Sequence, residues 1–228
     1  FNQKLYHLFP RREHAMAVLD MGCSGGGFVK SCLDDGCLAV GLEGSDFSKK
    51  RRRAEWATIP DFLFTCDITR DFDVMIDDGT QTKRALFDVV TAWEGIEHIK
   101  TEDLRKLSEN VKKHLKPSGL WIMSVSPNEE VVNGVVLHQT VQPKEWWIEK
   151  FATLGLTHLE EYDRYFHTQY VRGPKYGAPG SFHLILSKAP ANAPTIPAQG
   201  MSWKSRLYDS WLGSPTQKLV RRWLVGEG

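Results

Sequence analysis

Apolar runs and amphipathic runs alternate along this chain of 228 residues. The short runs, rich in apolar and β-branched residues, predict strands, and the longer runs between them predict helices. This alternation is typical of a mostly parallel sheet with helices on both faces, a doubly wound three-layer α/β fold. The strands are expected at Ala15–Cys23, Cys37–Gly44, Phe62–Ile68, Leu86–Trp93, Leu120–Ser126, Thr157–Phe166 and Ser181–Lys188.

Four of the intervening segments carry helix signals. Thr101–Lys116 has apolar residues three or four positions apart and acidic residues at its start. Pro143–Leu154 begins with a proline, which suits the first helical position. Ser48–Thr58 begins with a serine that suits a helix cap, and another helix is expected to start within Phe28–Leu33. The polar stretch Asp71–Arg84 is expected to be a loop.

The composition changes after Lys188. Residues 189–200 contain four Ala and three Pro, which predicts a linker. Residues 201–228 contain three Trp and five basic side chains against two acidic ones. This tail is expected to pack on the domain, to bind a partner chain or to lie on a membrane surface. The chain therefore divides into a domain over residues 1–188, a linker over 189–200 and a basic Trp-rich tail over 201–228.

Charge and cysteine content narrow the class of protein. Lys and Arg total 29 against 28 Asp and Glu, a net charge of +1, so the overall charge does not indicate a general nucleic-acid-binding protein. The basic run Lys49–Arg53 is interpreted as a solvated helix face in preference to a phosphate contact. No apolar run approaches the roughly 18 to 20 residues of a transmembrane segment, and we expect a cytoplasmic protein. The four cysteines form no CxxC pair, which favours reduced structural thiols.

A glycine-rich turn follows the first expected strand in the segment Val18–Phe28. Glycine is needed where the backbone must approach a bound cofactor closely. Dinucleotide-binding folds use such a turn too, so the turn alone does not identify the cofactor. The residues expected to contact the cofactor here are Asp20, Gly22, Cys23, Ser24, Gly26 and Phe28.

Two further acids stand at the ends of the next two expected strands. Glu43 lies about twenty residues after the turn, where a carboxylate can accept both ribose hydroxyl hydrogens. Asp67 is placed to accept from an adenine amino group while Ile68 covers the ring. Together with Asp20, these acids suit an adenosine that carries an amino acid and a positive sulfonium better than one that carries two phosphates.

The segments DMGCSGGGF, VGLEGSD, CDI and FDVVTAWEGIEHI resemble the successive motifs of the class I S-adenosylmethionine-dependent methyltransferases. LKPSGL resembles the turn before their fifth strand, and the resemblance covers Val18–Lys188. It implies S-adenosylmethionine as cofactor, with Gly44, Trp93 and Glu94 added to its contacts. It also implies a seven-stranded sheet whose antiparallel last strand lies between the fifth and sixth. Ser24 departs from the family's glycine, but serine is small, so binding is expected to survive.

A candidate reaction site follows the fourth strand, where Glu94, Glu97 and His98 form an ExxEH motif, and His138 lies in the long connection after the fifth strand. Such oxygen and nitrogen ligands suit Mg²⁺ or Mn²⁺. The motif is similar to that of the small-RNA 3′-terminal 2′-O-methyltransferases and the ubiquinone-pathway O-methyltransferases. This resemblance implies that all four side chains hold a metal that lowers the pKa of an acceptor hydroxyl. Two alternatives stay open: His98, with Glu97 and His138, acts as base or orients the acceptor, or the cluster is structural.

We therefore expect an S-adenosylmethionine-dependent O-methyltransferase that acts on a hydroxylated small molecule or a glycan. Methylation of an RNA 3′-terminal ribose is a weaker alternative, because the charge is near neutral and no RNA-binding module is recognised. A third alternative is a non-catalytic subunit that keeps the fold and holds a partner through its tail. Trp146 and Trp147 are aromatic candidates for an acceptor cleft, although a core position is the favoured interpretation.

Overall fold

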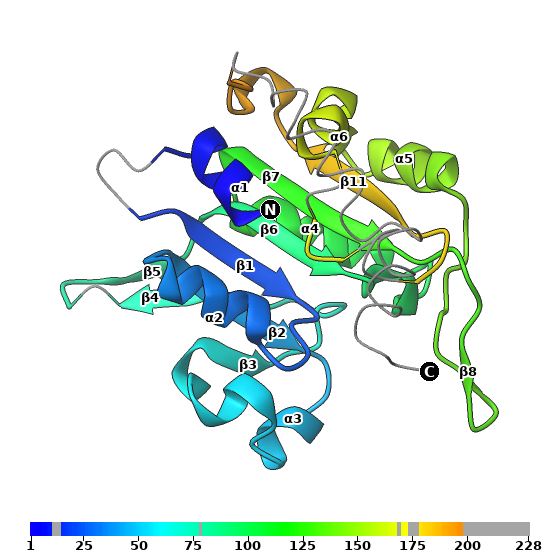
Figure 1. The fold of residues 1–228 in the computed structure, drawn as a ribbon, viewed down its shortest axis with the longest axis horizontal. Coiled ribbons are helices and arrows are strands. Elements are labelled where there is room, and N and C mark those ends of the chain that lie inside the picture. The colour runs from blue at the N-terminus through cyan, green and yellow to red at the C-terminus, as the bar shows by residue number, and fades with distance from the viewer. Residues whose placement is uncertain (11–14, 78, 168–169, 173–177, 198–228) are drawn as a thin grey trace, which may run out of the picture.

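A single seven-stranded sheet organises the part of the chain that this computed structural model describes, residues 1–10, 15–77, 79–167, 170–172 and 178–197. Its strands are β1 (Ala17–Met21), β2 (Leu38–Glu43), β3 (Leu63–Thr65), β6 (Phe87–Trp93), β7 (Leu115–Val125), β10 (Thr157–His158) and β11 (Phe182–Ser187). They lie in the order β10-β11-β7-β6-β1-β2-β3 (Figure 1). Every neighbouring pair is parallel except the two pairs that β11 makes. The expected mostly parallel sheet, with its antiparallel last strand inserted between the fifth and sixth, is confirmed.

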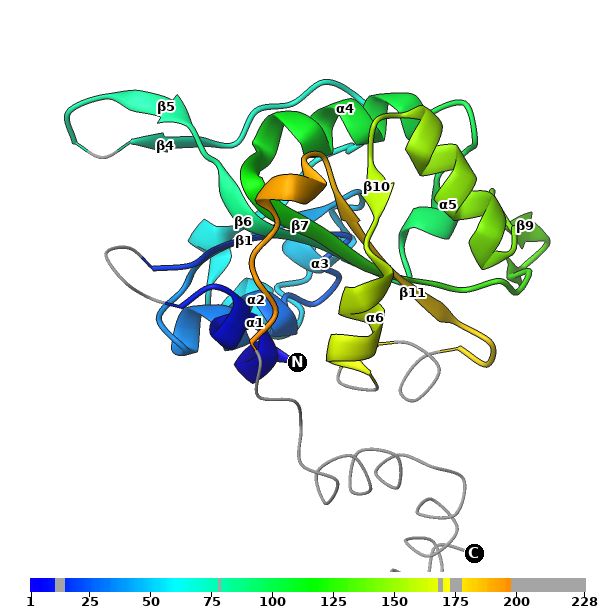
Figure 2. The same cartoon turned by 90° about the horizontal axis from the view of Figure 1, so that it is seen from above.

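Helices cover both faces of this sheet (Figure 2). One face carries α4 (Leu104–His114) and α5 (Lys144–Thr153), and the other carries α1 (Asn2–Leu8), α2 (Gly27–Asp34) and α6 (Glu160–Phe166). Each layer of helices has its own buried cluster against the sheet. The doubly wound three-layer fold is confirmed. None of the helices in the described part of the chain is long and apolar enough to cross a bilayer.

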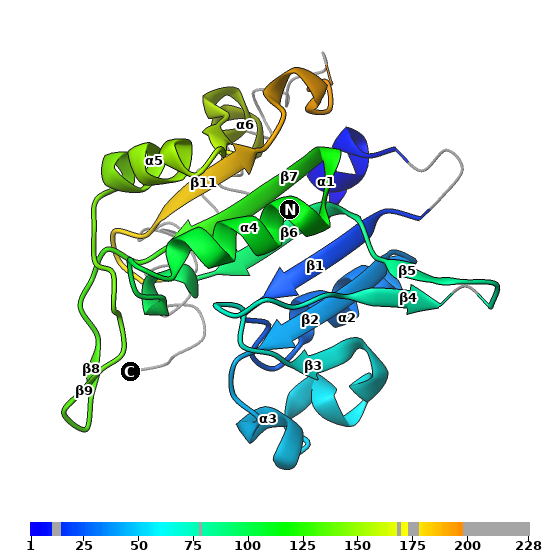
Figure 3. The same cartoon turned by 180° about the vertical axis from the view of Figure 1, so that it is seen from behind.

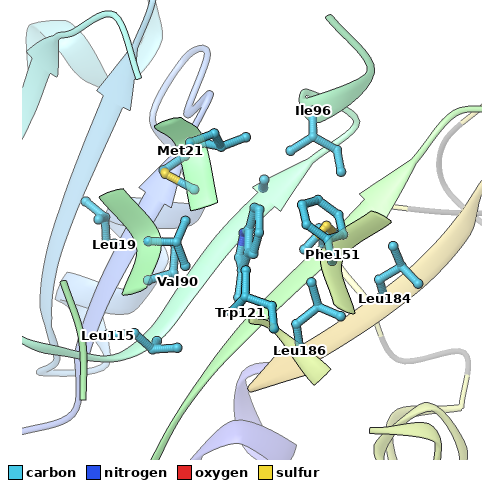
Figure 4. Packing of buried hydrophobic residues seen from close by; sticks show 14 of the residues in the cluster. Leu19, Met21, Val90, Ile96, Leu115, Trp121, Phe151, Leu184 and Leu186 are labelled. Atoms are coloured by element: carbon cyan, nitrogen blue, oxygen red, sulfur yellow. The ribbon is translucent and has the colours of Figure 1, made fainter. Parts of the chain in front are cut away.

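The two buried clusters follow from the alternation of side chains along the strands. Successive strand residues point to opposite faces, so Leu19 joins the cluster under α4 and α5 while Val18 joins the other one. In the first cluster the rings of Trp121 and Phe151 lie 4.9 Å apart, at 70° (Figure 4). Both side chains are fully buried, so α5 is fixed to the centre of the sheet.

The expected helix Ser48–Thr58 is wrong in its length. The segment forms α3 (Phe47–Lys50), with Asp46 in place of Ser48 at the cap position, and then the 3₁₀ turn η1 (Ala54–Ala57). Arg52 lies between them with φ at 47°, a left-handed conformation that interrupts a right-handed helix. A second 3₁₀ turn, η2 (Pro60–Phe62), leads directly into β3.

Two hairpins project from the sheet. The segment expected as a loop contains β4 (Met75–Asp77) paired with β5 (Thr82–Arg84), so that expectation is wrong in part. The long connection after β7 contains β8 (Val131–Val132) paired with β9 (Val135–Val136). Asn133 and Gly134 join β8 to β9 with positive φ at both positions, as a type I′ hairpin turn requires.

The expected strand Thr157–Phe166 is correct only for its first two residues, which form β10. The rest is α6, because acidic residues occupy its first turn and the buried Tyr162 and Phe166 are spaced four apart on one face. Other boundaries differ as well. Pro143 caps α5 from outside, β7 already begins at Leu115, α4 begins only at Leu104, and β3 ends at Thr65. The helix α1 was not expected from the sequence.

The beginning of the predicted linker lies against the domain. Pro190–Asn192 forms a 3₁₀ turn, η4, and the Tyr162 hydroxyl donates a hydrogen bond to the carbonyl oxygen of Pro194. Ala193 and Ile196 contact the cluster that α1, α2 and α6 share. The tail over residues 201–228 lies outside the described residues.

Candidate active site

A cavity of about 660 Å³ opens at the carboxyl ends of the parallel strands. Open α/β sheets bind their ligands at this edge, and the volume lies within the range of roughly 300 to 1,000 Å³ usual for small-molecule sites. Among the residues expected at the site, the cavity is lined by Gly22, Ser24, Glu43, Gly44, Asp67, Ile68, Trp93, Glu94, Glu97, His98 and His138. Arg172 also lines the cavity, and sequence reasoning missed the lining residues Gly95, Ile99, Ser126, Glu130 and Ala178.

The turn after β1 has the backbone conformation that its glycines allow. Gly22 and Gly26 have φ of 74° and 83°, and Ser24 adopts the same left-handed region with φ at 49°. The Ser24 N–H donates a hydrogen bond of 2.8 Å to Glu43 Oε2. A Cβ atom on Gly26 would lie 2.7 Å from Leu63 Cδ1, so glycine is required there. The turn and the acid of the next strand therefore form one connected unit.

The carboxylates of Glu43 and Asp67 are both held in place beside the cavity. Glu43 also accepts a 3.3 Å hydrogen bond from the Ser45 N–H. Asp67 Oδ1 accepts from the Thr69 hydroxyl at 2.6 Å and from the Thr69 N–H at 3.0 Å, and these bonds lower the pKa of Asp67. Two carboxylate acceptors and the apolar Ile68 in the lining of one cavity fit a ribose diol, an adenine amino group and an adenine ring.

Four residues expected to contact the cofactor are not part of the lining: Asp20, Cys23, Gly26 and Phe28. Asp20 is only 2% exposed, and its Oδ1 accepts a 2.7 Å hydrogen bond from the Thr91 hydroxyl. Burial raises the pKa of Asp20 to about 7. Phe28 packs edge-on against Trp93, with 5.8 Å between the ring centroids. The Asp20 and Phe28 side chains thus contact Thr91 and Trp93, and neither lines the cavity.

Glu94 contacts a segment far away in the sequence. Its Oε1 accepts hydrogen bonds from the Ala178 N–H at 2.7 Å and the Ser181 hydroxyl at 2.9 Å. Its Oε2 accepts from the Arg172 guanidinium at 3.3 Å. Glu94 therefore holds the chain before β11 at the cavity.

His98, Glu130 and His138 form a group whose ligand atoms all lie within 4.8 Å of one another. His138 Nε2 lies 3.0 Å from a Glu130 carboxylate oxygen, and its Nδ1 lies 2.5 Å from the Asn128 carbonyl oxygen. Both ring nitrogens of His138 thus face acceptor oxygens, and the tautomer of the imidazole decides which of the two contacts is a hydrogen bond. His98 Nδ1 lies 3.1 Å from the carbonyl oxygen of Leu137. A carbonyl partner at Nδ1 leaves the His98 Nε2 lone pair for a ligand.

Glu97 lies beside this group and is fully buried. Its Oε1 accepts a 3.1 Å hydrogen bond from the Ser126 N–H, whereas Oε2 has no hydrogen-bond partner among the described residues. Burial raises the pKa of Glu97 to about 7. An unpaired carboxylate oxygen at a cavity wall is a place where a bound hydroxyl or cation can be received.

The expected four-residue metal set is therefore brought together only in part. The structure groups the two histidines with Glu130, while Glu94 points to the segment before β11 and Glu97 stands next to the group. The sequence feature that could have identified Glu130 as a site residue is its position directly before the hairpin sequence Val-Val-Asn-Gly-Val-Val. Because a hairpin brings its two ends together, it sets Glu130 beside His138.

The fold and this site define a class I S-adenosylmethionine-dependent methyltransferase. Residues 1–169 match the family model described as a methyltransferase domain, and the chain belongs to that family.

Solved structures with the same fold include the following three. The protein DhpI, in a complex with S-adenosylhomocysteine, is 13% identical, with 83% of this chain and 81% of that one covered and a TM-score of 0.54. The sugar N-methyltransferase KedS8 from a Streptoalloteichus species is 16% identical, with coverage of 82% and 85% and a TM-score of 0.53. An O-methyltransferase from a polyketide synthase multienzyme of Brevibacillus brevis, with S-adenosylhomocysteine, is 15% identical, with coverage of 95% and 77% and a TM-score of 0.53.

Proposed function

We propose that this methyltransferase transfers its methyl group to a hydroxyl oxygen of a small molecule or a sugar. The observation that carries the proposal is the position of His98, Glu130 and His138 in the same cavity as Glu43 and Asp67. An alcohol must lose its proton as it becomes a nucleophile, and a group of imidazoles and carboxylates can take that proton or stabilise the oxyanion. The proposal thus rests on a group that can accept a proton at the acceptor end of the cavity.

In this proposal the cofactor residues have distinct tasks. Glu43 accepts the ribose hydroxyls, Asp67 accepts from the adenine amino group, and the Gly22–Ser24 backbone lets the cofactor approach the turn. S-Adenosylmethionine supplies an electrophilic methyl group on a sulfonium. Because the displacement is in line, the main contribution of the chain is to align the acceptor oxygen with that methyl group.

We propose that the acceptor site also binds a divalent cation such as Mg²⁺ or Mn²⁺. His98, Glu130 and His138 would hold it, and the free oxygen of Glu97 stands next to them. Its positive charge would lower the pKa of an acceptor hydroxyl. The alternative is that His98 acts as a base without metal, since burial lowers the pKa of His98 and keeps its imidazole neutral.

Metal binding is tested first, because it requires no acceptor. We expect Mn²⁺ to bind the wild-type chain, as its paramagnetic resonance spectrum can show, and to bind Glu130→Gln at least about tenfold more weakly. Glu129→Gln is the matched control, because it removes the same charge from the neighbouring exposed position. Mn²⁺ binding by Glu130→Gln that equals binding by the wild type and by Glu129→Gln would reject the metal and leave His98 as the base.

The acceptor is sought by incubating hydroxylated metabolites, sugars and short RNAs with the enzyme and S-adenosylmethionine. Mass spectrometry should find a product heavier by one methyl group, attached to oxygen. A methylated amine as the main product would overturn transfer to oxygen. A product confined to RNA 3′ ends would select the second expectation of the sequence, methylation of a terminal ribose.

A further inference from the structure

The β8–β9 hairpin exposes four apolar side chains to water. The exposed fractions of Val131, Val132, Val135 and Val136 are 57%, 45%, 60% and 51%. Val131 pairs with Val136, and Val132 pairs with Val135. Because successive strand residues point to opposite sides, each face of the hairpin presents one apolar pair. A two-stranded ribbon with valines on both faces and water around it is a solubility liability, so something is expected to cover it.

The shape of the hairpin decides what can cover it. A flat protein surface covers one face of a ribbon and leaves the other in water. The interfacial region of a bilayer can receive both faces at once, while its water and headgroups still satisfy the backbone groups at the two edges of the ribbon. The turn residues Asn133 and Gly134 carry no charge, so no ion would have to leave water at the tip. The hairpin is therefore suited to the boundary of a lipid bilayer.

A basic segment lies along the same side of the molecule. Phe47 of α3 is 53% exposed, and the run Lys49–Arg53 that follows it is exposed throughout. The guanidinium of Arg51 lies over the Phe47 ring, 5.4 Å from its centroid. Asp46 pairs with Lys50 at 2.6 Å and offsets one of the five positive charges. An exposed aromatic ring among basic side chains suits the phosphate region of an anionic membrane.

Both segments continue from the carboxyl ends of strands, α3 after β2 and the hairpin after β7. They lie along the lower side of Figure 1, and Figure 3 shows the same arrangement from behind. The β4–β5 hairpin extends from the other end of the sheet. The cavity lining reaches toward both segments, because it includes Gly44, three residues before α3, and Glu130, the residue before β8.

We propose that this rim, formed by Phe47, Lys49–Arg53 and Val131–Val136, docks the enzyme on an anionic lipid bilayer. The valines enter the apolar boundary, and the basic run meets the lipid phosphates. Two acids lie at the base of the hairpin, Glu129 and Glu130, and Glu130 is turned toward His138. If the proposed O-methylation also holds, the acceptor is an amphiphile whose hydroxylated head lies at the membrane surface, where the cavity opens.

The test is flotation of the full-length chain with vesicles of phosphatidylcholine mixed with phosphatidylglycerol, compared with vesicles of phosphatidylcholine alone. One variant replaces Val131, Val132, Val135 and Val136 by Thr, which keeps β-branching and removes four methyl groups. A second replaces Lys49, Arg51, Arg52 and Arg53 by Gln. We expect each variant to partition to the mixed vesicles at least about tenfold more weakly than the wild type.

Two matched controls come from the other parts of the surface. Met75→Thr changes an apolar side chain, 51% exposed, on the β4–β5 hairpin, and Lys106→Gln removes a positive charge from α4. Both should bind vesicles as the wild type does. Binding of S-adenosylmethionine, measured by calorimetry, shows that each variant is folded. A wild-type chain that did not bind S-adenosylmethionine would contradict the proposed function, but the flotation result would still test the docking proposal.

Four outcomes would overturn the docking proposal. The first is a wild-type chain that does not float with the mixed vesicles, and the second is a valine variant that floats as well as the wild type. The third is salt-dependent RNA binding that the glutamine variant loses, without vesicle binding, which assigns the basic run to nucleic acid. Self-association that only the valine variant loses, again without vesicle binding, would assign the hairpin to a second copy of the chain.

Discussion

Replacing Asp20 by Asn should stabilise the protein, and the gain should depend on pH. Asp20 is almost completely buried in β1, with the Thr91 hydroxyl as its hydrogen-bond donor. Burial raises the pKa of its carboxyl group from 3.8 to about 7. Asparagine has nearly the same shape and keeps an oxygen that can accept the bond from Thr91. The substitution therefore removes the buried charge and leaves the contacts of the side chain largely in place.

The expected magnitude follows from the two pKa values. At about 1.4 kcal/mol per tenfold change in proton affinity, the difference between 3.8 and about 7 corresponds to roughly 4 kcal/mol. The folded-state pKa lies above the unfolded one, so the Asp20 contribution is fully present below about pH 4. It is lost as the pH rises toward about 7, because the unfolded chain ionises first. We expect Asp20→Asn to equal the wild type near pH 4 and to be about 2 to 4 kcal/mol more stable near pH 8.

The assay is urea unfolding of the cofactor-free chain, followed by tryptophan fluorescence near pH 4, 6 and 8. Glu102→Gln is the control, because it neutralises an exposed carboxylate and should change the free energy of unfolding by less than about 0.5 kcal/mol. A stability gain of Asp20→Asn that is the same at every pH would refute the reasoning. It would show that the change acts through contacts and that the buried carboxyl is not neutral in the folded state.

Two further predictions concern the glycine turn and a buried histidine. Gly26→Ala should lower the free energy of unfolding by about 1 to 3 kcal/mol, because the residue has φ at 83° and the new Cβ would lie 2.7 Å from Leu63 Cδ1. Gly27→Ala, where nothing lies within 4 Å of the new Cβ, should be neutral or stabilising in the same urea experiment. His114 Nε2 accepts a 3.0 Å hydrogen bond from the Val74 N–H, and burial lowers the pKa of His114. Stability should fall as the pH drops below about 6.5, and His114→Gln should remove that part of the pH dependence, whatever its cost in overall stability.

The sheet could be predicted from the sequence because its central strands are buried on both faces. Leu86–Trp93 was expected as a strand, and the structure has Phe87–Trp93, since Asp88 is the only charged residue in that run. The segment Thr157–Phe166 was wrongly predicted to be a strand along its whole length, because aromatic residues favour strands in general. Its helical spacing and the acids Glu160 and Glu161 prevail, as the burial of one helix face contributes more than the intrinsic preference.

Some residues of the candidate site could likewise be predicted from the sequence, and others could not. Glu43 and Asp67 could be placed because strand ends of a parallel sheet meet at one edge, whatever the loops do. The contacts of the Glu94 side chain could not be predicted. Its partners Ala178 and Ser181 are more than eighty residues away in the sequence and lie in the segment before β11. Glu130 was missed because its proximity to His138 depends on the closing of a hairpin and on no motif.

The hairpin between Glu130 and His138 also bears on the order in which the chain folds. Hairpins close in about 1 to 10 μs, because their contacts are local. Those two side chains therefore come together whenever the Asn133–Gly134 turn forms. His98 joins them only after β6 and β7 have paired, a contact between distant parts of the chain. We therefore expect Glu130 and His138 to approach each other during folding before His98 joins them.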